Sequence, residues 1–258
     1  MQWIVQNNLY KEVAFYDFIN ALNSFGSKYD IVNVIPFSHE FSNEPIITEK
    51  IVVPMGATTM IGIGQEKGWE VFYNDNFAHT AWLENLGSNL LNSEAQVCKF
   101  KEINPTYNPF FIRPSEDRKI FSGQVIDKAN FDIWLRETTA LMQYAGYVTL
   151  TPDTEVIVSP LKAIHSEWRF FVVDGEIVTG SLYKRGDRVI SLPLIKNEDA
   201  EVFAKEMVAL WKPAKAFVID VALTDKGYRV IEYNCLNSSG FYASDLNKLV
   251  GAIEQLFA

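Results

Sequence analysis

Apolar and polar residues alternate most regularly near the C-terminal end of the chain, in the runs 217–223 and 228–234. Both runs are rich in β-branched and aromatic residues and flank a short polar turn, which is typical of two strands joined as a hairpin. Each run holds one carboxylate, Asp220 in the first and Glu232 in the second. Counting outward from the turn places these side chains near each other on adjacent antiparallel strands. Asn234 faces the same side because side chains alternate along a strand.

The pattern along the rest of the chain predicts alternating strands and helices. Strands are expected at residues 2–6, 29–37, 51–55, 68–74, 97–103, 108–114 and 154–161, followed by a hairpin over residues 167–185 with an Asp-Gly turn. Helices are expected at residues 9–22, 77–87, 131–144, 197–211 and 243–257, and another begins at Thr58 or Thr59. Ser244 or Asp245 is expected to cap the last helix.

Strands and helices alternate over the first 95 residues, which predicts a small α/β domain there. Two glycine-containing turns in this region, at residues 55–60 and 62–68, are candidates for binding an anion. Neither has the spacing of a P-loop or the G-x-G-x-x-G pattern of a dinucleotide fold. We interpret both as ordinary turns, so a nucleotide would have to bind elsewhere in the chain.

The composition narrows the class of protein. The chain has 258 residues, 48% of them hydrophobic, which is enough for a buried core. Its net charge of −9, from 23 basic and 32 acidic residues, argues against an extended nucleic-acid surface. No apolar run approaches the roughly 20 residues that span a bilayer, and the N-terminus resembles no signal peptide, so we expect a soluble, cytoplasmic protein. The two cysteines, Cys98 and Cys235, have no metal-type spacing.

The hairpin carboxylates are candidates for a metal site. An ionised carboxylate in an apolar strand is unfavourable unless a cation or several hydrogen bonds compensate it. Asp220, Glu232 and Asn234 supply three oxygen ligands at one place. This set suits Mg²⁺, which takes carboxylate and amide oxygens and leaves its other positions to water and phosphates. The alternative is a hairpin whose two acids face solvent at an edge.

Basic residues stand at the end of another apolar strand. Arg113 closes the strand at residues 108–114, and the polar loop that follows contains Lys119. A cation at the end of a buried strand, facing a glycine-containing loop, is suited to contact phosphate. The alternative is a surface salt-bridge cluster with Glu116 and Asp117.

Taken in order, these segments resemble an ATP-grasp protein. The resemblance rests on four segments: FFIRP, VIVSPLKAI, EWRFFVVDGEIV and FVIDVALTDKGYRVIEYN. It covers about residues 97–257 and is similar in particular to the clade named for one arginine and two lysines, found in bacteria and their viruses. It implies an ATP-grasp fold of mixed α/β (α+β) class, in which two subdomains hold ATP between antiparallel sheets. Residues 96–160 and 161–258 would be the two lobes of the grasp domain, and residues 1–95 the preceding domain.

The resemblance also implies roles for charged residues. Arg113 occupies the strand position where many ATP-grasp enzymes have a lysine, and Lys119 and Lys162 would be the two lysines of the clade. These cations would neutralise the phosphates of ATP while the hairpin carboxylates hold Mg²⁺. Glu167 and Arg169 lie on the same face of their strand, and both are expected to contact the nucleotide. Arg169 is the expected clamp for the terminal phosphate or an acyl phosphate.

Two further segments have expected contacts. Adenine is expected against residues 156–161, with backbone groups near Ser159 and Leu161 at its edge. The loop after the metal strand is expected to contact the acceptor substrate, and its candidate residues are Ser238, Ser239, Gly240 and Tyr242. The alternative for this loop is a simple turn before the last helix.

Together these features predict a ligase that uses ATP and Mg²⁺ to join a carboxylate to an amine through an acyl phosphate. Its expected partners are small-molecule or peptide substrates, with no nucleic acid and no membrane. Many relatives in this broad fold are dimers, and the sequence leaves the oligomeric state open. Two alternatives use the same site: a nucleotide-binding module without turnover, and a phosphotransferase acting on a hydroxyl. A ligase releases ADP and phosphate, a phosphotransferase releases ADP without free phosphate, and a binding module releases neither.

Overall fold

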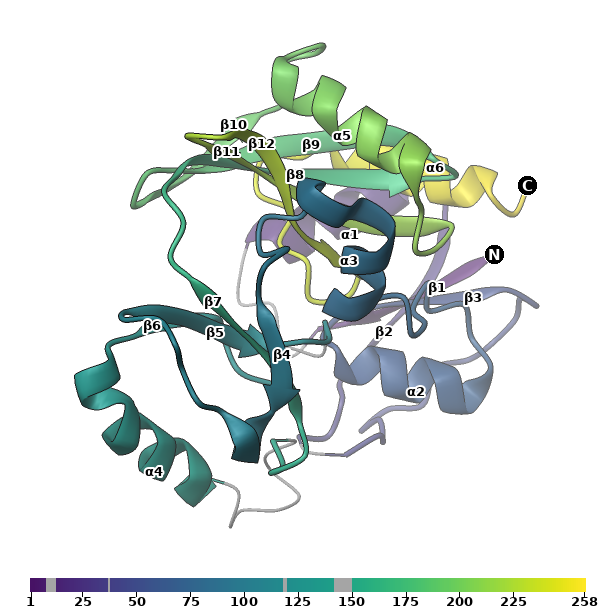
Figure 1. Ribbon diagram of the computed structural model, residues 1–258. Helices are drawn as coiled ribbons and strands as arrows, with labels where there is room; N and C mark the ends of the chain where they lie inside the picture. Colours follow the sequence, from purple (N-terminus) through teal and green to yellow (C-terminus); the bar gives the residue numbers. More distant parts are fainter. Residues whose placement is uncertain (8–12, 37, 118–119, 142–149) are drawn as a thin grey trace.

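Three β-sheets and six α-helices make up the part of the chain that the computed structural model describes, which is all residues except 8–12, 37, 118–119 and 142–149 (Figure 1). The N-terminal sheet is parallel, and the other two are antiparallel. Among the described residues, no helix combines the length and apolarity needed to cross a bilayer.

The parallel sheet has the strand order β2-β1-β3. The elements of this region are β1 (Gln2–Gln6), α1 (Val13–Phe25), β2 (Lys28–Val32), β3 (Val52–Met55) and α2 (Thr59–Lys67). Every residue of β1 is buried, because α1 packs on one face of the sheet and α2 on the other. α2 begins where the sequence predicts, after Thr58, and Gly68 ends it in the left-handed conformation with a φ of 70°.

The strand predicted at residues 68–74 is wrong. This segment is a connector that packs into two different cores. Val71 is buried against the cluster that contains α5 (Asp199–Leu210), and Phe72 is buried against the cluster that contains α1 and α6 (Leu246–Gln255). Phe72 also has a φ of 50°, which a regular strand does not accommodate. The alternation of apolar residues here therefore reflects burial on two sides rather than sheet pairing.

The four-stranded sheet, in the order β4-β7-β5-β6, forms the lower left lobe in Figure 1. Its elements are β4 (Gln96–Lys99), η2 (Phe100–Glu102), β5 (Phe110–Pro114), β6 (Gln124–Ile126), η3 (Lys128–Asn130), α4 (Phe131–Leu141) and β7 (Glu155–Pro160). α4 covers one face of the sheet, where Trp134 contacts Phe100 and Phe131. The strand predicted at residues 97–103 ends at Lys99 and continues as a 3-10 turn, while the three-residue β6 is too short for its periodicity to be read.

The five-stranded sheet has the order β10-β9-β8-β11-β12. Its strands are β8 (Ile164–Val173), β9 (Glu176–Arg185), β10 (Arg188–Pro193), β11 (Ala216–Thr224) and β12 (Gly227–Asn234). The helices around it are α3 (His79–Leu86), extended by η1 (Gly87–Asn89), then α5 (Asp199–Leu210) and α6 (Leu246–Gln255). Both predicted hairpins are confirmed. The exposed edge strand β10 was missed because it has no buried face to impose alternation.

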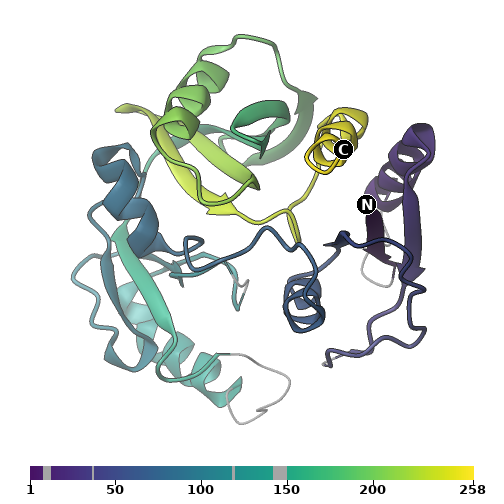
Figure 2. The ribbon, with the colours of Figure 1, turned by 90° about the vertical axis from the view of Figure 1, so that its right-hand side faces the viewer.

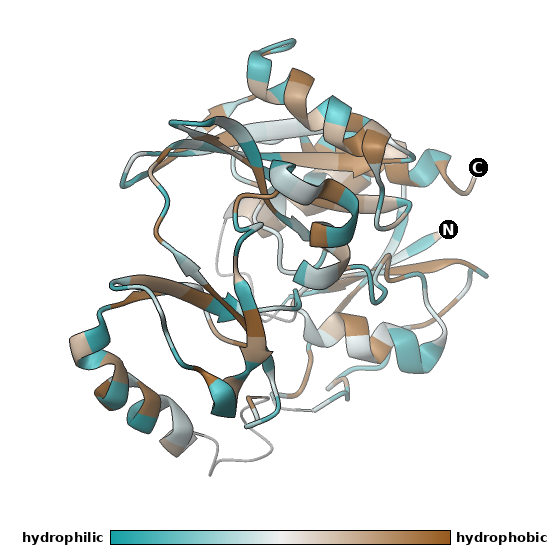
Figure 3. Cartoon of the chain, viewed as in Figure 1, coloured by the Kyte–Doolittle hydropathy of each residue, from teal (hydrophilic) through white to brown (hydrophobic). Residues whose placement is uncertain are grey.

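Helices cover both faces of the five-stranded sheet. α3 and α5 pack on one face, and α6 packs on the other together with α1. The first and last helices therefore lie side by side and share one core (Figure 2). Trp3 donates a 2.8 Å hydrogen bond from Nε1 to Oε1 of Glu254 in α6. Asp245 caps α6 by accepting a 3.2 Å hydrogen bond from the backbone N–H of Lys248. In Figure 3, brown hydrophobic stretches lie on strands of both antiparallel sheets, and the helices alternate between brown and teal.

Candidate active site

A cleft of about 370 Å³ lies between the two antiparallel sheets. Leu91, which lines the cleft, is tied to the five-stranded sheet by a backbone hydrogen bond from its N–H to Val230 O at 2.8 Å. The residues around the cleft are Leu91, Asn92, Phe111, Arg113, Gly123, Val125, Pro160, Leu161, Lys162, Ile164, Glu167, Tyr183, Lys184, Ile231 and Glu232. Five residues predicted from the sequence, from both sheets, thus line one space.

The C-terminal hairpin brings the predicted metal ligands together. Asp220 in β11 is the register partner of Glu232 in β12, and a bulge follows Asp220 in the ladder. Asn234 donates a 3.2 Å hydrogen bond from Nδ2 to Oδ2 of Asp220. Asp220 and Asn234 are buried, while the Glu232 side chain is 20% exposed and reaches the cleft. The expected convergence of these three side chains is found, and their role as metal ligands stays a prediction.

Arg169 is bound to Asp220 within the five-stranded sheet. Its Nε and Nη2 donate to the two carboxylate oxygens at 2.9 and 2.7 Å, and Nη1 donates to Gly240 O at 3.3 Å. Burial opposes the charge of Arg169, but Asp220 outweighs burial and raises the pKa of the guanidinium above its usual value. The predicted phosphate clamp and a predicted metal ligand are therefore a bidentate ion pair in this structure.

Two tyrosines lie against this ion pair. The rings of Tyr183 and Tyr242 stack with centroids 4.9 Å apart, and both centroids lie within about 5.5 Å of the Arg169 guanidinium carbon. Tyr183 donates a 2.6 Å hydrogen bond to Glu167, whose other carboxylate oxygen accepts from Lys184 at 2.7 Å. Burial, and then the charge of Asp220, raises the pKa of Tyr183. Glu167 is thus oriented by two donors at the cleft wall.

Arg113 reaches from the four-stranded sheet to the five-stranded one. Its Nη1 donates a 3.1 Å hydrogen bond to Oε2 of Glu232, and its guanidinium lies 5.0 Å from the ring centroid of Trp82. Arg113 is 7% exposed, and its carboxylate partner is Glu232, so the alternative of a surface cluster with Glu116 and Asp117 does not hold for it. Asp117 instead accepts a 2.8 Å hydrogen bond from Cys235 N–H.

Two of the remaining nucleotide candidates, Leu161 and Lys162, line the cleft. Lys162 forms an ion pair with Glu94, and burial, then Lys226, lowers the pKa of its ammonium. The hydroxyl of Ser159 is buried and donates to Asn92 Oδ1 at 3.1 Å, so only its backbone remains for a base edge. Leu161 is 44% exposed at the cleft. Lys119 lies outside the described residues.

The predicted substrate loop docks onto the turn between β3 and α2. Ser238 donates from its N–H to Gly56 O at 2.7 Å and accepts from Thr58 N–H through Oγ at 2.9 Å. Asn237 Oδ1 accepts from Gly56 N–H at 2.8 Å. The loop is therefore more than a turn before α6. Ser239 is buried and donates to Cys235 O at 2.7 Å, which leaves Gly240 and Tyr242 nearest to Arg169.

The sequence did not reveal several residues that shape the site. Tyr183 lies on the same face of its sheet as the predicted site residues. The alternation of side chains along the strand was not enough to assign it a role from the sequence. Trp82, Lys184 and Asn92 carry no motif and reach the site only through the fold. The contact between Gly56 and Asn237 joins residues 181 positions apart. A requirement for glycine at position 56 is visible only in the structure, because a Cβ there would approach the Gln6 side chain to 2.6 Å.

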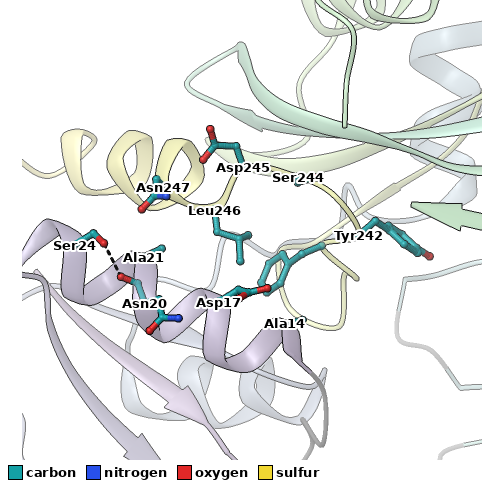
Figure 4. A pocket seen from close by; sticks show the side chains of 11 residues that line it. Ala14, Asp17, Asn20, Ala21, Ser24, Tyr242, Ser244, Asp245, Leu246 and Asn247 are labelled. Atoms are coloured by element: carbon teal, nitrogen blue, oxygen red, sulfur yellow. Dashed lines mark hydrogen bonds between the residues drawn. The ribbon is translucent and has the colours of Figure 1, made fainter. Parts of the chain in front are cut away.

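A second cavity, of about 470 Å³, lies in the groove between α1 and α6 (Figure 4). Polar side chains such as Asp17, Asn20 and Asn247 line it, and Tyr242 forms one end. In Figure 4 the Tyr242 side chain points away from this groove. Among the residues that line this cavity, only Tyr242 is a predicted site residue. The groove is therefore not included in the candidate site.

The donor set of the hairpin fits Mg²⁺ that arrives with a nucleotide. No group of three or more His, Cys, Asp or Glu side chains among the described residues is arranged to hold a metal ion. Two carboxylates and an amide remain, and each carboxylate is balanced here by an arginine, Asp220 by Arg169 and Glu232 by Arg113. Mg²⁺ uses one or two protein carboxylates and completes its shell with water and phosphate oxygens. The residues present therefore suit that ion only when phosphate oxygens share it.

Solved structures with the same fold are ATP-grasp ligases. The chain is similar to D-cycloserine synthetase DcsG, with 12% identity, a TM-score of 0.67, and coverage of 100% of this chain and 99% of that one. The D-alanine–D-alanine ligase from Bacillus anthracis, complexed with ATP, has 13% identity and a TM-score of 0.59, covering 98% and 92%. The ligase PsnB, complexed with a minimal precursor, Mg and ADP, has 11% identity and a TM-score of 0.54, covering 100% and 98%. No curated protein matches the chain.

The family is shown by the sequence itself. The model of an ATP-grasp domain, family 3 of the clade named for one arginine and two lysines, matches residues 45–253. This span includes both antiparallel sheets, the cleft between them and every predicted site residue. The ATP-grasp fold and the resemblance to the arginine-and-lysine clade are both confirmed. The chain therefore belongs to family 3 of this clade of ATP-grasp proteins.

Proposed function

We propose that this protein is an ATP- and Mg²⁺-dependent ligase that joins a carboxylate to an amine through an acyl phosphate. One observation carries the proposal: two carboxylates on neighbouring strands, Asp220 and Glu232, are each paired with a buried arginine, and the pair of Glu232 with Arg113 lines a cleft between two antiparallel sheets. Paired groups of opposite charge at this place suit a ligand that is itself anionic and accompanied by a cation. A simple structural core would not need four buried or half-buried charges there.

The cleft can hold a nucleotide along its length. The base would lie against β7, with backbone groups near Ser159 and Leu161 at its edge, and Glu167 would meet the ribose side. Arg113, Lys119 and Lys162 would neutralise the phosphates. The volume of about 370 Å³ is within the range of small-molecule pockets.

The metal would be held by Asp220, Glu232 and Asn234. When bound there, Mg²⁺ would offset the negative charge that builds up during transfer. Arg113 and Arg169 balance these carboxylates in this structure, so both guanidiniums would become available to phosphate oxygens once the carboxylates held the cation. This exchange of partners keeps the number of buried charges balanced.

Two steps would then join the substrates. An oxygen of the acid's carboxylate attacks the terminal phosphorus of ATP, which gives an acyl phosphate and ADP. The nitrogen of the amine attacks the acyl carbon, phosphate leaves, and the amine loses a proton. Arg169 would stabilise the negative oxygens in both steps. Gly240 and Tyr242, with Ser238 and Ser239 behind them, would form the wall against the acceptor.

The proposal extends to the domains and substrates. Residues 1–95 would form the preceding domain, and residues 96–160 and 161–258 the two lobes, because each region contains one sheet. The acid and the amine would be small molecules or peptides. The docking of the loop at Ser238 onto Gly56 supports a contribution of the N-terminal domain to the acceptor side.

The test is turnover with candidate pairs of acids and amines. A ligase releases ADP and phosphate together, and only when acid, amine, ATP and Mg²⁺ are all present. ADP without free phosphate would show a phosphotransferase instead. Tight ATP binding with neither product, over a broad panel of substrates, would favour a binding module. If ATP with Mg²⁺ gave no rise in melting temperature at millimolar concentration, the nucleotide site itself would be wrong.

A further inference from the structure

A cluster of buried polar atoms lies where α3 meets β5, next to the proposed phosphate site. His79, the first residue of α3, has no exposed surface, and neither of its ring nitrogens has a hydrogen-bond partner among the described residues. The same holds for Oγ of Ser115 and for Nε and Nη2 of Arg113. Buried polar atoms are almost always paired in folded proteins, so a group of unpaired ones in one place requires an explanation.

The fold brings these side chains together. The backbone N–H of His79 donates to Ser115 O at 2.9 Å, which fixes the start of α3 against the end of β5. Trp82, one turn further along α3, contacts the side chains of both His79 and Arg113. Its ring centroid lies 6.3 Å from that of His79, in an edge arrangement, and 5.0 Å from the Arg113 guanidinium carbon. His79 and Arg113 therefore share one aromatic partner.

The charge states of the two side chains are complementary. Burial, and then the charge of Arg113, lowers the pKa of His79 to about 4, so the imidazole is neutral at neutral pH. A neutral imidazole has one nitrogen that accepts a hydrogen bond, whereas a guanidinium only donates. An uncharged acceptor can hold an arginine without cancelling its positive charge. A carboxylate such as Glu232 holds it too but does cancel the charge.

Arg113 needs such a partner when the site is loaded. Under the proposed function, Glu232 turns to the cation, and Arg113 then loses the carboxylate that it contacts in this structure. Part of the guanidinium would contact the phosphates, while the edge that carries Nε would remain buried next to α3. An acceptor on α3 would keep the guanidinium in the plane that suits a phosphate.

We propose that His79 is a positioning residue: in the loaded site its imidazole accepts a hydrogen bond from Arg113, one that is not made in this structure, and holds the guanidinium toward the nucleotide phosphates. This inference rests on the proposed ATP site and assigns a role to a residue outside the predicted set. Its role is exerted through Arg113, so its effect on nucleotide binding requires the planar guanidinium at position 113.

A double-mutant cycle on the full chain tests this dependence. The dissociation constant of ATP with Mg²⁺ is measured by calorimetry for wild type, His79→Leu, Arg113→Lys and the double variant. We expect His79→Leu to weaken binding about tenfold in the wild-type background. In the Arg113→Lys background, which retains the charge but not the buried Nε side, the same change should alter binding less than twofold.

Three further variants separate positioning from packing. His79→Gln retains an acceptor and should bind ATP within about twofold of wild type. His79→Phe fills the same space without an acceptor and takes the place of His79→Leu if that variant does not fold. His165→Leu, at the exposed histidine paired with Asp225, is the matched control and should leave binding unchanged.

The outcomes distinguish the inference from the proposed function. If wild type binds ATP but the effects of the His79 and Arg113 changes simply add, or His79→Gln is as weak as His79→Leu, His79 is structural and the inference is overturned alone. If wild type binds no ATP with Mg²⁺, the proposed function and the inference both fall. Tenfold weakening that disappears in the Arg113→Lys background supports the inference.

Discussion

Arg169 and Arg113 are equally buried, at 8% and 7% exposed, but they are paired very differently. Arg169 makes two hydrogen bonds to Asp220 and a third to the backbone of Gly240. Arg113 donates one hydrogen bond, to Glu232, and two of its nitrogens have no partner among the described residues. Similar burial therefore does not mean a similar role. Arg169 is held by three hydrogen bonds in this structure, whereas Arg113 retains donor groups for another partner.

The two pairs also differ in what they connect. Arg169 and Asp220 lie on neighbouring strands, β8 and β11, of one sheet, where the ladder holds their backbones in register. Arg113 and Glu232 lie on β5 and β12, in different sheets. A change in the placement of the two sheets would alter the second pair directly and leave the first intact. The pair within one sheet therefore depends on that sheet alone, whereas the pair between sheets depends on how the two sheets are placed.

Breaking the pair within the sheet is expected to have the largest effect. Asp220→Asn leaves Arg169 charged and buried without its carboxylate, which typically costs about 3–5 kcal/mol. We expect the free energy of unfolding, measured by urea denaturation, to fall by that amount. Asp225→Asn, which removes an exposed carboxylate paired with His165, is the control and should change it by less than about 0.5 kcal/mol. A loss below about 1 kcal/mol for Asp220→Asn would show that Arg169 does not depend on this pair.

The neighbourhood of Arg113 should respond to pH. His79 titrates near its ordinary pKa of about 6.5 when unfolded but at about 4 in the folded protein. The unfolded chain therefore binds a proton that the folded protein does not, so stability falls as pH decreases from about 6.5 to about 4, by up to about 3 kcal/mol. Above pH 6.5 this group has no effect.

This pH dependence is measured by the difference between variants. His79→Leu should lose less stability than wild type between pH 7 and pH 4.5, because it lacks the imidazole that the unfolded chain protonates in this range. Both free energies come from urea denaturation at each pH. Identical slopes for wild type and His79→Leu would mean that His79 titrates normally in the folded protein.

The two arginine pairs also show what the sequence could predict. The hairpin of β11 and β12 was predicted, and counting outward from its short turn placed Asp220 and Glu232 near each other. Asp220, Glu232 and Asn234 could therefore be placed together from the sequence alone. The direct pairing of Asp220 with Glu232 also depends on the bulge after Asp220, which the sequence did not indicate. Arg113 could be placed at the end of a strand, but its partner Glu232 is 119 residues away, and local periodicity carries no information about such a pair.

The residues that the sequence missed are held by contacts between distant segments. His79 is the first residue of a short helix, and nothing in its neighbours shows that it is buried beside Arg113. The connector at residues 68–74 has the alternation of a strand, but it lies between two cores that only the folded chain creates. Apolar residues that recur with a period of 2 or 3.6 indicate which side chains are buried. A connector that is buried on two sides therefore has the same alternating pattern as a strand.

Breaking the pair between sheets is expected to cost less stability but to change ligand binding. Glu232→Gln removes the charge yet retains an oxygen that can accept from Arg113, and the Glu232 side chain is already 20% exposed. We expect a loss of about 1–2 kcal/mol in the free energy of unfolding. The rise in melting temperature that ATP gives with Mg²⁺ should disappear. A variant that keeps both the full rise and its Mg²⁺ dependence would remove Glu232 from the proposed metal site.

The smallest expected effect concerns Tyr242, which covers the Arg169 pair. Tyr242→Ala removes the ring stacked on Tyr183 and should lower the free energy of unfolding by about 1 kcal/mol. Tyr242 has a φ of 50°, a conformation that costs alanine about as much as tyrosine but costs glycine nothing. Tyr242→Gly should therefore be more stable than Tyr242→Ala, although it too lacks the ring. Both variants are measured in the same urea series. If Tyr242→Gly is no more stable than Tyr242→Ala, the left-handed backbone at Tyr242 is not strained. The position of the ring over Arg169 would then be set by stacking alone.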